Sequence, residues 1–165
     1  MKTIFTILLV LLFCFSINAQ DGKFEFQNIC GDPTVESISF TQFSGKVVEI
    51  VDGDTVVIKS KGKRRIVNLV TVDASSNNSE AQKFLSKKIL KKNIFFSISY
   101  NSKKDDTQVF ADIFYEDISV NRSMLTTGIA RYKEPENYTF SNYKACVYQQ
   151  LEEIAKKEKI GIWAK

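Results

Sequence analysis

The amino-acid sequence predicts an α+β fold, a five-stranded β-barrel that carries three helices. The predicted elements follow in the order β-β-β-α-β-β-α-α, which suits a small barrel with added helices. The chain has 165 residues, enough for one domain with its own core. Residues 40–165 contain no internal repeat and no linker, so we expect them to form a single domain.

Three strands begin this domain, and two glycine turns join them. Runs of β-branched and aliphatic residues predict strands at Lys46–Val51, Thr55–Ser60 and Lys63–Val72. Between them stand Asp52-Gly53 and Lys61-Gly62, in which glycine can supply the positive φ of a tight turn. We therefore expect the Asp-Gly pair to close a β-hairpin.

The remaining elements are predicted from hydrophobic periodicity and from signals at helix ends. After a polar loop, Ser79 is expected to cap a helix over Glu80–Lys92, whose apolar residues recur at helical spacing. Two alternating strands and two helices follow, at Ile94–Tyr100, Val109–Tyr115, Asn121–Thr127 and Ser141–Lys157. This arrangement predicts the barrel of an OB-fold.

The composition is that of an ordinary globular protein with a mildly basic surface. Charged residues make up 25% of the chain, and 23 Lys and Arg against 19 Asp and Glu give a net charge of +4. Such a surface permits a polyanionic partner without requiring one. The sequence holds no histidine, which excludes histidine general bases, Ser-His-Asp triads and histidine-ligated zinc. Hydrolysis by this chain would depend on carboxylates, arginines and an oxygen-ligated metal.

The first 20 residues are expected to be a secretory signal peptide. Lys2 precedes an apolar run over Ile4–Phe15, and small and polar residues continue to Gln20. Phe13 stands before Cys14, where a lipoprotein anchor wants a small residue. We therefore expect export without a lipid anchor.

The mature chain is expected to have two parts. An N-terminal arm covers residues 21–42, and the barrel domain covers residues 43–165. We expect a periplasmic or secreted monomer without a membrane span, because the only long apolar run lies in the signal peptide.

Three acidic residues mark the ends of predicted strands. Asp52 and Asp54 flank Gly53, and Asp54 opens the return strand although Asp is disfavoured in strands. Asp73 ends the next β-rich run. Acids at two strand ends could meet at one edge of the barrel and bind a hard cation, which takes oxygen ligands. The alternative is that Asp52 and Asp54 only cap the turn.

The sequence resembles the staphylococcal-nuclease-like, or thermonuclease-like, domain family. The resemblance covers about residues 40–165, and the matching segments occur in the family's order. They are Val51-Asp52-Gly53-Asp54-Thr55-Val56, Leu69-Val70-Thr71-Val72-Asp73, Glu80-Ala81 at the start of a helix, Val120-Asn121 with Gly128-Ile129-Ala130, and Ala155-Lys156-Lys157-Glu158-Lys159-Ile160-Gly161-Ile162-Trp163. Each match is weak alone, whereas five in order are strong evidence for the fold.

The resemblance implies a calcium-dependent enzyme that hydrolyses phosphodiesters in DNA and RNA. Family enzymes use two metal-binding aspartates, a glutamate near the attacking water and two arginines that hold the phosphate, because the transition state develops negative charge. Asp54 and Asp73 match the metal aspartates, and Asp52 matches the acid behind them. Tyr132 stands where family members place site tyrosines and could stack on a base; the alternative is that it packs at the rim of the core.

The catalytic positions depart from the family pattern. Asn68 stands at the first arginine, Ser76 at the glutamate and Gln108 at the second arginine. These residues keep hydrogen-bonding groups but supply no charge. The sequence therefore predicts that nuclease activity is lost or very weak, and that the domain binds single-stranded DNA or RNA and holds calcium weakly. Two alternatives remain, an active calcium-dependent nuclease with substituted catalytic residues, and a structural or protein-interaction domain.

Two cysteines remain once the signal peptide is removed. Cys30 lies in the arm, and Cys146 lies in the first turns of the last helix. Disulfides persist in exported proteins, and an even pair in such a protein favours a bridge. We expect a Cys30–Cys146 disulfide; the alternative is two buried free thiols.

Overall fold

The computed structural model describes residues 29–31, 42–101, 107–135 and 141–164. The predicted signal peptide, residues 1–20, lies outside the described residues, as does most of the arm over residues 21–42. No helix of the described part of the chain is long and apolar enough to cross a membrane.

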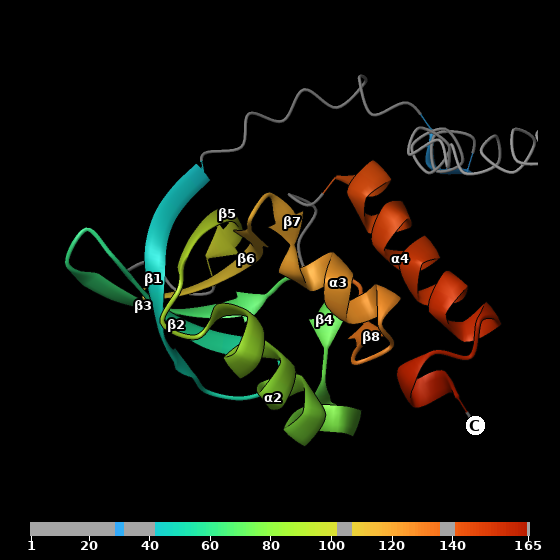
Figure 1. The fold of residues 1–165 in the computed structure, drawn as a ribbon. Coiled ribbons are helices and arrows are strands. Elements are labelled where there is room, and N and C mark those ends of the chain that lie inside the picture. The colour runs from blue at the N-terminus through green and yellow to red at the C-terminus, as the bar shows by residue number, and fades with distance from the viewer. Residues whose placement is uncertain (1–28, 32–41, 102–106, 136–140, 165) are drawn as a thin grey trace, which may run out of the picture.

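Five strands form a closed mixed barrel, as predicted (Figure 1). They are β1 (Gln42–Ile50), β2 (Thr55–Ser60), β3 (Lys63–Leu69), β5 (Asn93–Asn101) and β6 (Gln108–Tyr115). Neighbours in the order β3-β2-β1-β5-β6 pair antiparallel, and a parallel pairing of β3 with β6 closes the barrel. The two-residue β7 (Ile118–Ser119) extends the sheet beyond β6.

Alternation along the strands decides which side chains fill the barrel. Val47, Ile58 and Val67 are fully buried, whereas their neighbours Lys46, Lys59 and Ile66 are exposed. Because successive residues of a strand point to opposite faces, the first set lies inside the barrel and the second on its outer wall.

Helix α2 (Asn78–Ile89) packs under the barrel and buries Ala81, Leu85 and Ile89 (Figure 1). It begins before the predicted Glu80, and Ser79 is not its N-cap, so that prediction is wrong. Asn77 holds the cap position, but its side chain does not cap the helix and instead donates to the carbonyl of Ile129, at 3.2 Å. The side chain of Asn78 instead accepts a hydrogen bond from the backbone amide of Gly53, at 2.5 Å.

Helices α3 (Val120–Thr126) and α4 (Asn142–Lys157) pack together on the side of the barrel away from the β2–β3 hairpin (Figure 1). Both begin at serine caps. The Ser119 hydroxyl accepts a hydrogen bond from the backbone amide of Arg122, and the Ser141 hydroxyl accepts one from the backbone amide of Lys144. A second apolar cluster lies beneath them and consists of Val70, Leu125, Val147, Tyr148 and Leu151.

Two buried polar groups join these helices to the barrel. The side-chain amide of Asn121 donates to the carbonyls of Val70 and Ala111, at 2.9 and 3.1 Å. Asp112 of β6 accepts hydrogen bonds from the hydroxyls of Tyr148 and Ser119. Burial raises the pKa of the Asp112 carboxyl, and the hydrogen bonds from these hydroxyls offset part of its lost hydration.

The third predicted strand is shorter than expected. β3 ends at Leu69, and Thr71 has a φ of 63°, which turns the chain out of the barrel. The next two residues form β4 (Val72–Asp73), which pairs with β8 (Arg131–Tyr132) instead of with the barrel strands. This break lifts Asp73 away from the barrel wall and toward the segment that follows β8.

A disulfide joins Cys30 to Cys146, with Cα atoms 5.6 Å apart. It attaches a residue of the arm to the first turns of α4, 116 positions further along the chain. This is the pairing that the sequence favours.

Candidate functional site

The turn between β1 and β2 carries two acids and a buried glycine. The Asp52 carboxylate accepts the backbone amide of Asp54, at 3.0 Å, so Asp52 caps the turn. Gly53 does not adopt a positive φ, and the predicted reason for this glycine is wrong. A Cβ at Gly53 would lie 2.7 Å from Cβ of Ala74 and 2.9 Å from Cβ of Ala81. Glycine is needed here because the turn packs directly against the segment after β4 and against α2.

Asp54 is half-buried and already holds hydrogen bonds on both carboxylate oxygens. One oxygen accepts the amide of Ala74, at 3.1 Å, and the other accepts the hydroxyl of Thr55, at 3.2 Å. Desolvation by burial raises the pKa of Asp54, and the nearby charge of Asp52 adds to this rise. The surroundings of Asp54 thus disfavour its charged form.

Asp73 has the opposite electrostatics. Its carboxylate accepts the backbone amide of Ser75, at 2.8 Å. Hydrogen bonds from Ser75 lower the pKa of Asp73, and the positive charges of Lys133 and Arg131 lower it further. Asp73 therefore stays ionised over a wider pH range than Asp54.

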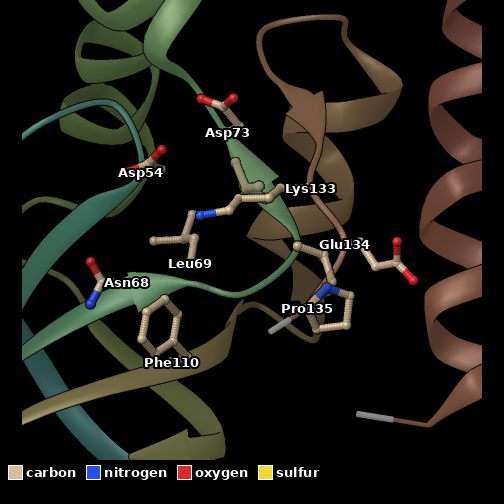
Figure 2. Close-up of a pocket in the computed structure, with 10 residues that line it drawn as sticks. Asp54, Asn68, Leu69, Asp73, Phe110, Lys133, Glu134 and Pro135 are labelled. Atoms are coloured by element: carbon tan, nitrogen blue, oxygen red, sulfur yellow. The ribbon is translucent and has the colours of Figure 1, made fainter. Parts of the chain in front are cut away.

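Both aspartates line one open pocket of about 280 Å³. Figure 2 shows them on one side, with the Lys133 side chain reaching across the pocket toward Asp54 and Asn68. The lining residues come from the β1–β2 turn, from β3, β4 and Thr71 between them, from β6 and from the segment after β8. They are Asp54, Asn68, Leu69, Thr71, Val72, Asp73, Phe110, Lys133, Glu134 and Pro135.

Asn68, the residue at the first predicted arginine position, lies in this pocket. It pairs with Thr55 across β2 and β3, and its side-chain oxygen lies 3.2 Å from the Thr55 hydroxyl, whose one proton it shares with Asp54. A neutral amide at this place can donate a hydrogen bond to a phosphate but cannot neutralise its charge.

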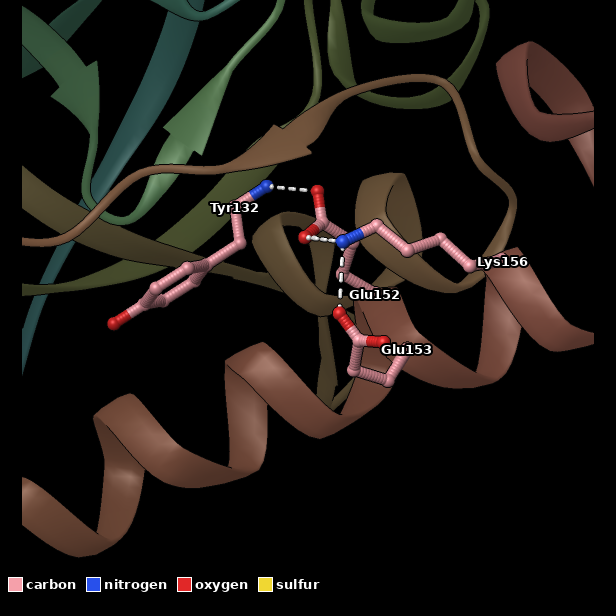
Figure 3. A network of polar contacts seen from close by, with 4 residues as sticks. All are labelled: Tyr132, Glu152, Glu153 and Lys156. Carbon is pink, nitrogen blue, oxygen red and sulfur yellow. Dashed lines mark hydrogen bonds and ion pairs between the residues drawn. The ribbon is translucent and has the colours of Figure 1, made fainter.

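Four other predicted site residues do not line the pocket, and one of them is Asp52, whose carboxylate caps the β1–β2 turn. Ser76 is exposed in a short 3₁₀-helix (Ser75–Asn77). Gln108 pairs with Ile66, which places it on the outer wall of the barrel two residue pairs beyond Asn68 and Phe110. Tyr132 is half-buried against the second apolar cluster, and its amide donates to Glu152 of α4 at 2.9 Å (Figure 3). The position of Tyr132 matches the alternative of a core-rim residue.

Among the lining residues that the sequence did not indicate as site residues, Phe110 offers an aromatic ring and Lys133 a cation to a ligand. Strand alternation could have indicated Phe110, because it lies two residues after Gln108 on the same face of β6. Lys133 directly follows Tyr132, but only the pairing of β8 with β4 brings it to Asp73. No local pattern in the sequence indicates that pairing.

Calcium is the metal that the family resemblance implies, and the pocket fits it only in part. Calcium takes six to eight oxygen ligands, of which Asp54 and Asp73 would supply two. Across the described ranges, no group of three or more His, Cys, Asp or Glu side chains is arranged to hold a metal ion. The donor set suits a cation that keeps most of its water.

Comparisons with known proteins agree with this architecture. The family model described as "Staphylococcal nuclease homologue" matches residues 58–165. The chain is 30% identical over 125 residues to a Haemophilus influenzae protein named "Uncharacterized endonuclease", a match that covers 72% of this chain and 65% of that protein. It is 28% identical over 133 residues to an uncharacterized Bacillus anthracis protein, covering 73% of this chain and 60% of the relative. The chain thus spans less than two thirds of the length of either relative, and on the family match it belongs to the staphylococcal nuclease family.

Proposed function

We propose that this chain is an exported protein that binds single-stranded nucleic acid in the pocket of Asp54 and Asp73, with nuclease activity lost or very weak. One observation carries the proposal. The pocket combines the carboxylates of Asp54 and Asp73 with Lys133 and Phe110, while the neutral Asn68 stands where a family enzyme has an arginine. Glu134 also lines the pocket, but its carboxylate is directed away from the two aspartates (Figure 2). Lys133 and Phe110 supply binding groups, whereas neutral residues replace the two arginines and the glutamate with which family enzymes stabilise a reacting phosphate.

The argument against efficient catalysis rests on charge and position. Loss of one preorganised stabiliser of a transition state typically lowers the rate by about 10²–10³, although such losses do not add simply. Here Asn68 and Gln108 are neutral, and Ser76 is exposed outside the pocket. On the same face of β3 the next arginine is Arg64, four residues away or ~13 Å along the strand, and it pairs with Glu49 at 2.9 Å.

The argument for binding rests on Lys133 and Phe110. The Lys133 ammonium reaches into the pocket (Figure 2) and can neutralise one phosphate. Phe110 is half-buried, so part of its ring is available for stacking against a base. Stacking and a single cation recognise any nucleotide, which suits binding without sequence preference.

Two other functions are supported by single observations. An active calcium-dependent nuclease with substituted residues is favoured by the name of the Haemophilus influenzae relative. A structural or protein-interaction role is favoured by the hydrogen bonds that already engage Asp54, which are those of a turn cap.

One experiment separates these functions. The purified mature chain is mixed with labelled single-stranded DNA in calcium, and both binding and cleavage are followed as salt is varied. We expect binding that weakens with salt, lost in Lys133→Gln and kept in the exposed control Lys157→Gln, with cleavage absent or orders of magnitude below an intact relative. Cleavage within about tenfold of that relative, and abolished by Asp54→Ala, would overturn the proposal; absence of both binding and cleavage would favour a structural role.

A further inference from the structure

The outer wall of β1, β2 and β3 presents cross-strand rows that lead away from the pocket. Directly paired residues of adjacent strands point to the same face. The first row, Thr55 and Asn68, adjoins the pocket. The second row is Glu49, Val57 and Ile66, and the third is Lys46, Lys59 and Arg64. Moving from the first row to the third follows β3 from Asn68 to Arg64.

The third row, here called the basic row, consists only of cations. Lys46 pairs with Lys59, and Lys59 pairs with Arg64, and all three residues are exposed. Like charges directly opposite each other destabilise a sheet, so local sheet stability gives no reason for this row. A polyanion lying across it would remove the repulsion and gain from all three charges.

The second row forms the floor of a shallow apolar groove. Val51, Val57, Ile66 and both arginines at positions 64 and 65 line it, together with Glu49 and Thr107. Ile66 and Val51 are 43% and 46% exposed, which is unusual for aliphatic side chains that meet on one surface. The groove therefore has an apolar floor and a cationic border.

We propose that the outer wall of β1–β2–β3 continues the binding site, so that a single nucleic-acid strand leaves the pocket, lays a base on Val51 and Ile66, and places its next phosphates on the basic row. This inference rests on the proposed function. Asn68 and Arg64 lie ~13 Å apart along β3, a span that needs more than one nucleotide. An apolar floor beside a row of cations matches a strand with alternating bases and phosphates better than it matches a ligand that carries charge alone.

Glu49 is the one acid in these two rows, and it modulates the site. Its carboxylate pairs with the Arg64 guanidinium at 2.9 Å, and the two side chains are 54% and 62% exposed. An exposed pair of this kind is weak, so a phosphate can displace Glu49 from Arg64. Removal of the Glu49 charge should therefore strengthen binding of a strand that reaches the basic row.

The test compares a thymidine dinucleotide with a thymidylate dodecamer, both titrated into the mature chain in the presence of a chelator. The affinity for the dinucleotide measures binding in the pocket, and the additional affinity for the dodecamer measures binding to the outer wall. We expect the double variant Lys59→Gln/Arg64→Gln to lose this gain and to lower the salt slope by about 1.4, since each contact to a single strand contributes about 0.7. The control Lys87→Gln/Lys157→Gln makes the same charge change on exposed helix positions and should bind as the wild type does; thermal unfolding verifies that both variants fold.

Two further variants separate nucleic acid from polyanions in general. Glu49→Gln should raise the affinity for the dodecamer and leave the affinity for the dinucleotide unchanged. Ile66→Ala should lower the affinity for the dodecamer alone. The inference is overturned if the dodecamer binds no more tightly than the dinucleotide. It is also overturned if the control variant loses as much dodecamer affinity as the test variant; in both cases the proposed function stands. The assignment to nucleic acid is overturned if a heparin fragment binds the basic row as tightly as the dodecamer does and Ile66→Ala does not change the affinity for the dodecamer. Failure of the dinucleotide itself is the failure of the proposed function.

Discussion

The carboxylate of Asp54 accepts a hydrogen bond from the backbone amide of Ala74, at 3.1 Å, and Ala74 directly follows Asp73. This bond ties the β1–β2 turn to the end of β4 and brings the two aspartates to one pocket. It also makes them electrostatically unequal. Burial and Asp52 raise the pKa of Asp54, whereas bonds from Ser75 and the charges of Lys133 and Arg131 lower the pKa of Asp73.

The first prediction concerns the pH dependence of stability. A carboxyl whose pKa is raised by folding holds its proton more tightly in the folded state, so the free energy of unfolding falls as pH rises from its ordinary pKa to its folded pKa. Asp54→Asn should abolish this fall and should leave the protein at least as stable at neutral pH. Chemical unfolding of the wild type and Asp54→Asn between pH 3 and 7 measures it.

Asp73→Asn is the matched comparison and should do the opposite. The lowered pKa of Asp73 contributes stability above its ordinary pKa, and this contribution is lost as pH falls through its folded value. The variant should therefore be less stable than wild type at neutral pH, with the difference vanishing in acid. Equal effects of the two substitutions would contradict the electrostatics assigned to the pocket.

The second prediction concerns calcium. With only Asp54 and Asp73 as carboxylate ligands, we expect a dissociation constant of about 10⁻⁴–10⁻³ M, the range of weak calcium sites. Lys133→Gln should tighten binding, because the Lys133 charge acts on Asp73. Asp73→Asn should abolish it. Titration calorimetry of the mature chain with calcium measures this constant. A sub-micromolar value would mean that residues other than Asp54 and Asp73 also bind the ion.

The sequence predicts the barrel well because the barrel follows from local patterns. Strand alternation places Val47, Ile58 and Val67 inside, and Gly62 adopts the positive φ expected of it, 79°. Gly53 is different. Its turn is correctly located, but the glycine is required by Ala74 and Ala81, which lie far along the chain. A close approach between distant segments leaves no signature in the local sequence.

Only the part of the pocket that follows from local patterns could be predicted. Asp54 and Asp73 could be predicted because each is an acid at the end of a predicted strand, and the bond from the Ala74 amide to Asp54 helps to hold both at the pocket. Lys133 reaches them only because Thr71 turns the chain out of the barrel and lets β4 pair with β8. Sequence matching placed Gln108 at a family position, whereas the pairing of β3 with β6 puts it beside Ile66.

The third prediction concerns the contact that holds β8. Glu152 is buried, accepts the amide of Tyr132 at 2.9 Å, and accepts Lys156 at 2.8 Å on its other oxygen (Figure 3). Glu152→Ala would leave that amide without its partner, so we expect a loss of about 1–3 kcal/mol in the free energy of unfolding. The neighbouring Glu153 also pairs with Lys156 but is exposed, and Glu153→Ala should cost at most about 1 kcal/mol. Denaturant unfolding of both variants makes the comparison, and equal losses would show that the Tyr132 contact contributes nothing.

The last prediction concerns the cysteines, and it also tests export. In the unreduced, denatured mature protein, thiol titration should find no reactive thiol, because Cys30 and Cys146 are joined. A chain that keeps residues 1–20 should instead show one thiol, that of Cys14. Reduction, or the double variant Cys30→Ser/Cys146→Ser, should lower the free energy of unfolding by up to ~4–5 kcal/mol, because the bridge closes a loop of more than 100 residues in the unfolded chain. Two reactive thiols in the mature protein would mean that the Cys30–Cys146 bridge does not form.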